Sequence, residues 1–173
     1  MLSRSGIAAV LAALAAAGIV APEDATSTAS RQAAEDCRVT RANGPDGVHG
    51  RGSISVSLGS KATWVASDDP QTRPEGTMVA QRRPDGSIYA KILWYRSKRA
   101  YGRFRITGRE RTTQARARLN GVDESHTSPI VPSSLIFSEP GCWRITARAG
   151  KGRLRFTIRV VDATSQSREA APG

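Results

Sequence analysis

The chain has 173 residues, of which 26 are Lys or Arg and 15 are Asp or Glu, so its formal charge at pH 7 is +11. This length fits one domain rather than two. An apolar fraction of 39% supplies one modest core and excludes wholesale disorder, whereas nine prolines and sixteen glycines favour strands and turns over long helices.

The N-terminus has the pattern of a secretory signal peptide. Arg4 precedes an uncharged apolar run over residues 7–21. The alternative, a membrane anchor, needs about 20 apolar residues, and a proline and two acidic residues follow this run at once. We therefore expect a signal peptide over residues 1–21, cleaved after Ala17 or a few residues later. Residues 22–36 would then form a flexible linker. The mature protein would be exported, periplasmic or extracellular, and would have no membrane span.

The two cysteines, Cys37 and Cys142, lie near opposite ends of the remaining chain. An exported chain with an even number of cysteines is typical of disulfide formation. We predict a Cys37–Cys142 bridge that fastens the N-terminal segment to the last strands.

Short stretches in which apolar and polar residues alternate run through the rest of the chain, and this two-residue period is typical of half-buried strands. They cover residues 53–58, 88–95, 103–107, 115–119, 143–149 and 154–160. Residues 83–86 have the sequence of a tight turn, and Gly150 and Gly152 favour a hairpin between the last two strands.

About seven or eight short strands without a convincing helix predict an all-β fold, and an Ig-like antiparallel β-sandwich over residues 37–161 is the first choice. A small barrel is the alternative. We expect the tail over residues 162–173 to be disordered.

The alternation also divides the aromatic residues between two faces. Trp94, Trp143 and Phe156 occupy inward positions and are the predicted core anchors. Tyr89 and Tyr95 face the opposite way, where they would line a ligand or partner surface.

No catalytic or metal pattern stands out. His49 and His126 are the only histidines, and neither lies at metal-ligand spacing. Neighbouring residues of an extended segment point in opposite directions, so residues 123–126 (DESH) cannot form a relay among themselves. Asp68 and Asp69 fit a turn. We expect that the protein is not an enzyme and binds no cofactor.

Positive charge is concentrated in residues 97–161, with 14 Lys or Arg against 4 Asp or Glu. In the last hairpin, the inward set leaves a row of arginines outside, with Arg148 opposite Arg153 and Thr146 opposite Arg155. The candidate anion-binding face comprises Arg103, Arg105, Arg144, Arg148, Arg153, Arg155 and Arg159. Basic surfaces attract polyanions, and export favours envelope polymers over nucleic acid. The alternative is a solvated arginine-rich surface that reflects a GC-rich genome.

Several segments together resemble a family of uncharacterised secreted bacterial proteins. They are Cys37 with Val39, Thr40 and Asn43, then Trp64, residues 91–96 (KILWYR), residues 102–108 (GRFRITG), and residues 135–156 with the PGCW motif. The resemblance implies export and an Ig-like β-sandwich but no activity. Arg38 and Arg144 depart from the family, whose members tend to carry Pro and an acidic residue there.

Together these features predict a non-catalytic exported module of the bacterial cell envelope that contacts anionic polymers or surfaces. The alternatives are an accessory or inhibitor subunit that binds another exported protein and, more distantly, a hydrolase whose residues meet only in the folded chain.

Overall fold

The computed structural model describes residues 36–67, 74–122 and 127–163. The predicted signal peptide, the linker up to residue 35 and the tail from residue 164 lie outside these ranges. The strands are β1 (Val48–His49), β2 (Ile54–Ser57), β3 (Thr63–Ser67), β4 (Met78–Arg82), β5 (Ile88–Arg96), β6 (Arg105–Glu110), β7 (Arg116–Val122), β8 (Ile130–Phe137), β9 (Gly141–Ala149) and β10 (Gly152–Asp162). Two short 3-10 helices, η1 (Pro45–Gly47) and η2 (Lys98–Ala100), complete the described elements.

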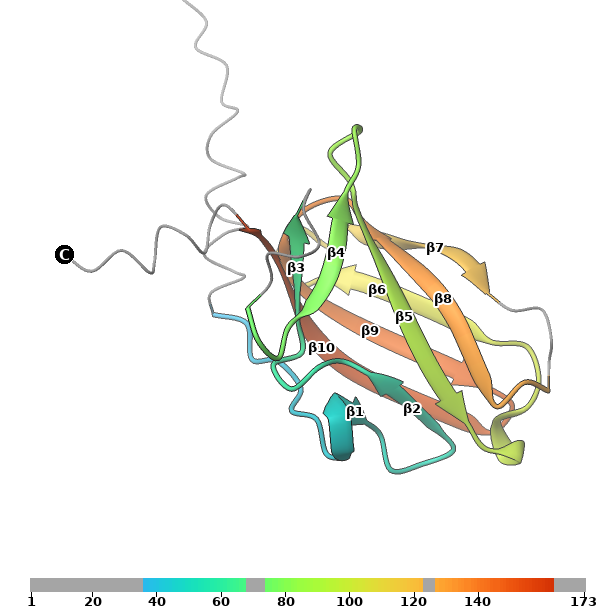
Figure 1. Ribbon diagram of the computed structural model, residues 1–173. Coiled ribbons are helices and arrows are strands. Elements are labelled where there is room, and N and C mark those ends of the chain that lie inside the picture. Colours follow the sequence, from blue (N-terminus) through green and yellow to red (C-terminus); the bar gives the residue numbers. More distant parts are fainter. Residues whose placement is uncertain (1–35, 68–73, 123–126, 164–173) are drawn as a thin grey trace, which may run out of the picture.

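The strands form one closed sheet, and the predicted Ig-like sandwich of two sheets is wrong. The order runs β5-β4-β3-β10-β9-β6-β7-β8, and β8 pairs again with β5 from Tyr95↔Ile130 to Ile88↔Phe137 (Figure 1). Eight strands therefore close into a barrel, the alternative that the alternation pattern left open. The pattern failed to distinguish the two because inward and outward residues alternate along a strand in both architectures.

The barrel is not wholly antiparallel. Strand β3 runs parallel to both of its neighbours, β4 and β10, whereas the remaining pairs of the closed sheet are antiparallel. Strand β2 pairs with the end of β5 beyond the reach of β4, and β1 pairs with β2. The predicted turn at residues 83–86 joins β4 to β5, with Gly86 N donating to Arg83 O at 2.9 Å.

Side chains of the described strands fill the interior. The three tryptophans, Trp64, Trp94 and Trp143, are fully buried, and Phe156 is 2% exposed. Ring centroids lie 4.9 Å apart between Phe137 and Trp143 and 5.7 Å apart between Trp94 and Phe156. An eight-stranded barrel is just wide enough for such a core, so the outer surface is the part of the barrel that is open to a ligand.

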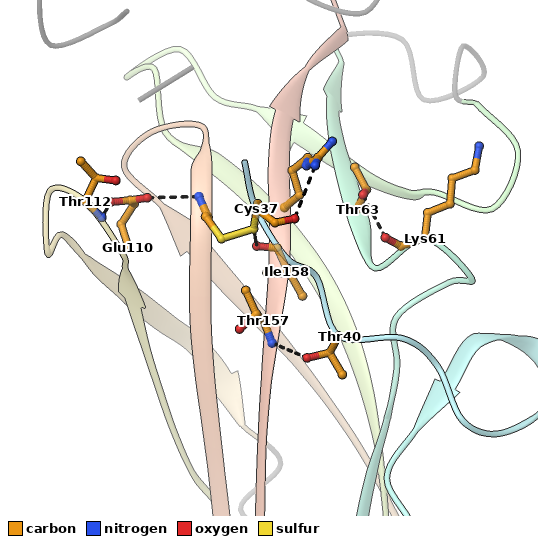
Figure 2. Close-up of a disulfide and its surroundings, with 10 residues drawn as sticks. Cys37, Thr40, Lys61, Thr63, Glu110, Thr112, Thr157 and Ile158 are labelled. Atoms are coloured by element: carbon orange, nitrogen blue, oxygen red, sulfur yellow. Dashed lines mark hydrogen bonds between the residues drawn. A yellow bond between two sulfur atoms is a disulfide. The ribbon is translucent and has the colours of Figure 1, made fainter. Parts of the chain in front are cut away.

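A disulfide joins Cys37 to Cys142, with 5.4 Å between the two Cα atoms (Figure 2). It fastens the N-terminal segment across the outside of β9 and β10. Thr40 N donates to Thr157 O at 2.9 Å, and Thr157 N donates to Thr40 Oγ1 at 2.8 Å. The segment thus lies against the middle of β10, from Thr157 to Arg159.

Candidate anion-binding face

Three adjacent strands bring arginines from two parts of the sequence together. Strand β9 lies between β6 and β10, and its register places Arg148 beside Arg105 on one side and beside Arg153 on the other. Because the neighbouring residues Ile106, Ala147 and Leu154 are inside the barrel, all three arginines lie on the outside and are exposed. We call Arg105, Arg148 and Arg153 the first arginine row. Directly opposite residues of this kind have Cβ atoms about 5 Å apart.

A second arginine row lies further along the same strands. Arg109 of β6 is beside Arg116 of β7 and beside Arg144 of β9, and these three side chains are also exposed. Between the two rows, Thr107 lies beside Thr146. On β10, Arg155 follows the first row and lies beside Thr146. The two rows and Arg155 together form the arginine face.

No carboxylate of the described residues forms an ion pair with the arginine face, and both Glu110 and Asp162 have other partners. Glu110, inside the barrel, accepts hydrogen bonds from Cys142 N at 3.1 Å and from Thr113 N at 2.7 Å. Asp162 pairs with Arg82 at the far end of β10. Like charges opposite one another in a sheet repel, so the arginine face is an electrostatic cost to the fold that a bound anion would remove.

Two residues of the predicted face lie outside both rows. Arg103 is exposed in the segment before β6. Arg159 is half-buried under the N-terminal segment, where its Nη2 donates to Cys37 O at 3.4 Å, so it serves that attachment.

Sequence patterning missed Arg109 because the alternation of β6 breaks after Thr107, and it missed Arg116 because no local pattern shows that β7 pairs with β6. The inward positions that follow are Gly108 and Glu110, which are not apolar side chains. Position 108 faces the interior and has no room for a side chain, because a Cβ there would lie 2.8 Å from both Ala117 Cβ and Ile145 Cδ1. Counting every second position beyond the apolar residues would have found Arg109.

A second outer feature is a groove of about 580 Å³ over β5 and β8. Its lining includes Tyr89, Lys91, Leu93, Pro132 and Ser134. Ser134 Oγ donates to the Tyr89 hydroxyl at 2.7 Å. Among the described residues, the β4 ladder on β5 stops at Tyr89 and the β2 ladder begins at Trp94, so residues 90–93 face no strand on that edge.

The other candidate residues do not gather into a reaction centre within the described ranges. His49 Nδ1 lies 3.2 Å from Arg41 O, and its ring meets Phe156 edge-on with 6.3 Å between centroids. His126, the rest of residues 123–126, and the pair Asp68 and Asp69 lie outside the described residues. In the described ranges, no three His, Cys, Asp or Glu side chains are grouped so as to hold a metal ion.

One acidic group has a displaced titration. Hydrogen bonds from Ser87 Oγ at 2.6 Å and Ser87 N at 3.0 Å lower the pKa of Asp85 below its usual value. This interaction fixes the β4–β5 turn. None of the helices in the part of the chain that the structure describes is long and apolar enough to cross a membrane.

Comparison with known proteins identifies no family, since no family model matches the chain and no curated protein is significantly similar to it. One solved structure with some similarity is described as a "Putative Lipoprotein from Bacillus anthracis". It has 14% sequence identity and a TM-score of 0.42, over 73% of this chain and 88% of that one. At this level the likeness establishes neither a fold nor a function for this chain.

Proposed function

We propose that this protein is an exported, non-catalytic β-barrel module that binds an anionic polymer of the bacterial cell envelope through the arginine face. The observation that carries the proposal is the first arginine row, in which three exposed arginines from three strands lie side by side without a carboxylate partner among the described residues. Guanidinium groups match phosphate and carboxylate geometry with paired hydrogen bonds.

Two further features support export and a binding role. The Cys37–Cys142 disulfide fits an oxidising compartment, as does the signal-like run over residues 7–21. Among the described residues, the most deeply buried acidic side chain is that of Glu110, which is occupied by backbone hydrogen bonds at the end of β6. Its role is therefore structural, and the arginine face has the chemistry of binding rather than of proton transfer.

Salt-gradient elution from an immobilised anionic polymer tests the proposal. Replacing Arg148, Arg153 and Arg155 by Gln should lower the elution salt and flatten the salt dependence, because fewer counterions are released on binding. The matched control replaces Arg38, Arg41 and Arg51 by Gln, which removes the same charge from exposed positions elsewhere. Equal elution of the two triple variants would mean that net charge alone retains the protein.

The groove over β5 and β8 favours a second candidate, an accessory subunit that binds an extended segment of another exported protein. An unpaired strand edge recruits extended peptides through backbone hydrogen bonds. The unpaired edge of β5 borders this groove, whose lining includes the apolar residues Leu93 and Pro132 and the charged residue Lys91. A photoreactive residue in place of Leu93 should then crosslink to one discrete exported protein. The same residue in place of Arg155 should not, and indiscriminate labelling from both positions would contradict this candidate.

A further inference from the structure

We propose that the arginine face contains two separate oligophosphate sites, one on each arginine row, and that a phosphate polymer lies across the strands along a row. This inference rests on the proposed function and specifies its ligand class and stoichiometry. The two rows share strands β6 and β9, so their separation follows directly from the strand register.

The rows are short and far apart. Neighbouring strands are about 4.8 Å apart, so three adjacent arginines span about 10 Å of backbone across the sheet. Along β6 the two rows are represented by Arg105 and Arg109, and along β9 by Arg148 and Arg144. Four residues of an antiparallel strand rise about 13 to 14 Å. Each row is thus a compact cluster, and the gap between the rows is wider than the row is long.

The gap carries no charge on two of its strands. Thr107 and Thr146 occupy it on β6 and β9. At physiological ionic strength the screening length is about 8 Å, which is less than the distance between the rows. An anion at one row therefore has little electrostatic effect on the other, and the two rows bind independently. On β10, Arg155 stands in the gap itself, beside Thr146, and is the one charge of the gap on these three strands, whereas Thr157 lies beside Arg144 at the end of the second row.

Closely spaced phosphates suit such a row better than isolated carboxylates. A row presents three guanidinium groups at strand spacing, so the ligand needs several negative charges within about 10 Å. A chain of linked phosphates has a charge on every unit, and each phosphate oxygen pair accepts a guanidinium fork. A polypeptide polycarboxylate places successive charges of one face about 7 Å apart, so only two of them reach one row.

Titration calorimetry with inorganic tripolyphosphate tests this inference on the full exported chain with its disulfide intact. The parent should bind two equivalents. Arg148→Gln should weaken one site about tenfold and leave the other, and Arg144→Gln should do the same for the second row. The double variant should weaken both sites by the same factor, and Arg51→Gln should match the parent. Thermal midpoints no lower than that of the parent would show that all variants are folded.

The outcomes separate this inference from the proposed function. A single equivalent that both variants weaken would show one continuous site and overturn the two-site arrangement. Absence of tripolyphosphate binding, with polymer retention still reduced in the Arg148, Arg153 and Arg155 variant, would overturn the phosphate assignment alone. Unaltered polymer retention in that variant would instead overturn the proposed function, whatever the calorimetry gives.

Discussion

Glu110 is a fully buried acidic residue whose carboxylate is held by hydrogen bonds from the backbone. Its side chain is completely buried at the end of β6, where it accepts hydrogen bonds from the backbone N–H groups of Cys142 and Thr112 (Figure 2). The backbone N–H of Thr113 donates to it as well. Gly141 makes the room, since a Cβ there would lie 2.9 Å from Glu110 Oε1. A buried charge is tolerated only when it is hydrogen-bonded in this way.

Replacing Glu110 by Ala should therefore lower the free energy of unfolding by about 3 kcal/mol, because several buried backbone donors lose their acceptor. Glu110→Gln, which keeps the volume and one acceptor oxygen, should cost less. Urea unfolding measures both changes. Glu139→Gln is the control, because the Glu139 side chain is half-exposed and accepts a hydrogen bond from a side-chain hydroxyl, that of Thr113, rather than from the backbone. Equal midpoints for Glu110→Ala and the control would contradict this role.

Trp143 anchors the core at the same end of the barrel. Its ring packs on Phe137, and its Nε1 donates to Glu139 O at 3.3 Å. Trp143→Ala should lower the free energy of unfolding by about 3 to 5 kcal/mol, as is usual for a buried large aromatic side chain. Thermal unfolding measures the effect, and Trp143→Phe should retain most of the stability. An unaltered midpoint in the Ala variant would place the indole outside the core.

At the scale of the element, the β9–β10 hairpin combines an apolar inner face with an outer face on which like charges lie opposite one another. Ala149 pairs with Gly152, so the connection is the two residues Gly150 and Lys151. Gly150 adopts a positive φ of 50°, as expected for this turn, whereas Gly152 is required for space, because a Cβ there would lie 2.7 Å from Ser53 Oγ. The apolar inner face fixes the register, and this register places Arg148 opposite Arg153.

Replacing Arg153 by Glu should turn this repulsive pair into an attractive one. We expect the free energy of unfolding to rise by about 0.5 kcal/mol, within the usual range for cross-strand pairs. Thermal unfolding at low and high salt checks this, since the gain should shrink as salt screens the pair. Arg38→Glu, at an exposed position outside the hairpin, should show no such gain. A destabilised Arg153→Glu would indicate that the arginines do not repel in the free protein.

At the scale of the whole molecule, the disulfide and the closure of the sheet act together. The bridge spans 105 residues of sequence and holds the N-terminal segment on β10, next to the parallel pairing of β3 with β10. Closing a loop of this length restricts the unfolded chain strongly.

Removing the bridge with the double variant Cys37→Ser and Cys142→Ser should lower the free energy of unfolding by about 4 to 5 kcal/mol on the chain-entropy account. Hydrogen exchange at Thr157 N should accelerate as well, because its acceptor Thr40 is held near β10 by the bridge. Mass measurement with and without reductant establishes the bridge beforehand. Equal stability with and without reductant would show that the disulfide does not stabilise the fold.

The sequence by itself determined the features that depend on local patterns. Alternation placed the core faces of β5, β9 and β10 correctly, including Trp94, Trp143 and Phe156, and two cysteines in an exported-type chain led to the bridge that the structure contains. It also predicted the pairing of Arg148 with Arg153, since the inward parity of two strands joined by a short turn leaves little choice of register.

Only the tertiary structure decided which strands are neighbours. The pairing of β5 with β8 closes the barrel, and the parallel pairing of β3 with β10 joins residues nearly a hundred positions apart. Neither leaves a mark on alternation, because a strand has the same period whichever strand it pairs with. The same holds for the arginine face. Arg105 and Arg109 join Arg148 and Arg144 through the β6–β9 pairing, a long-range contact that the core selects by packing and that no local pattern encodes.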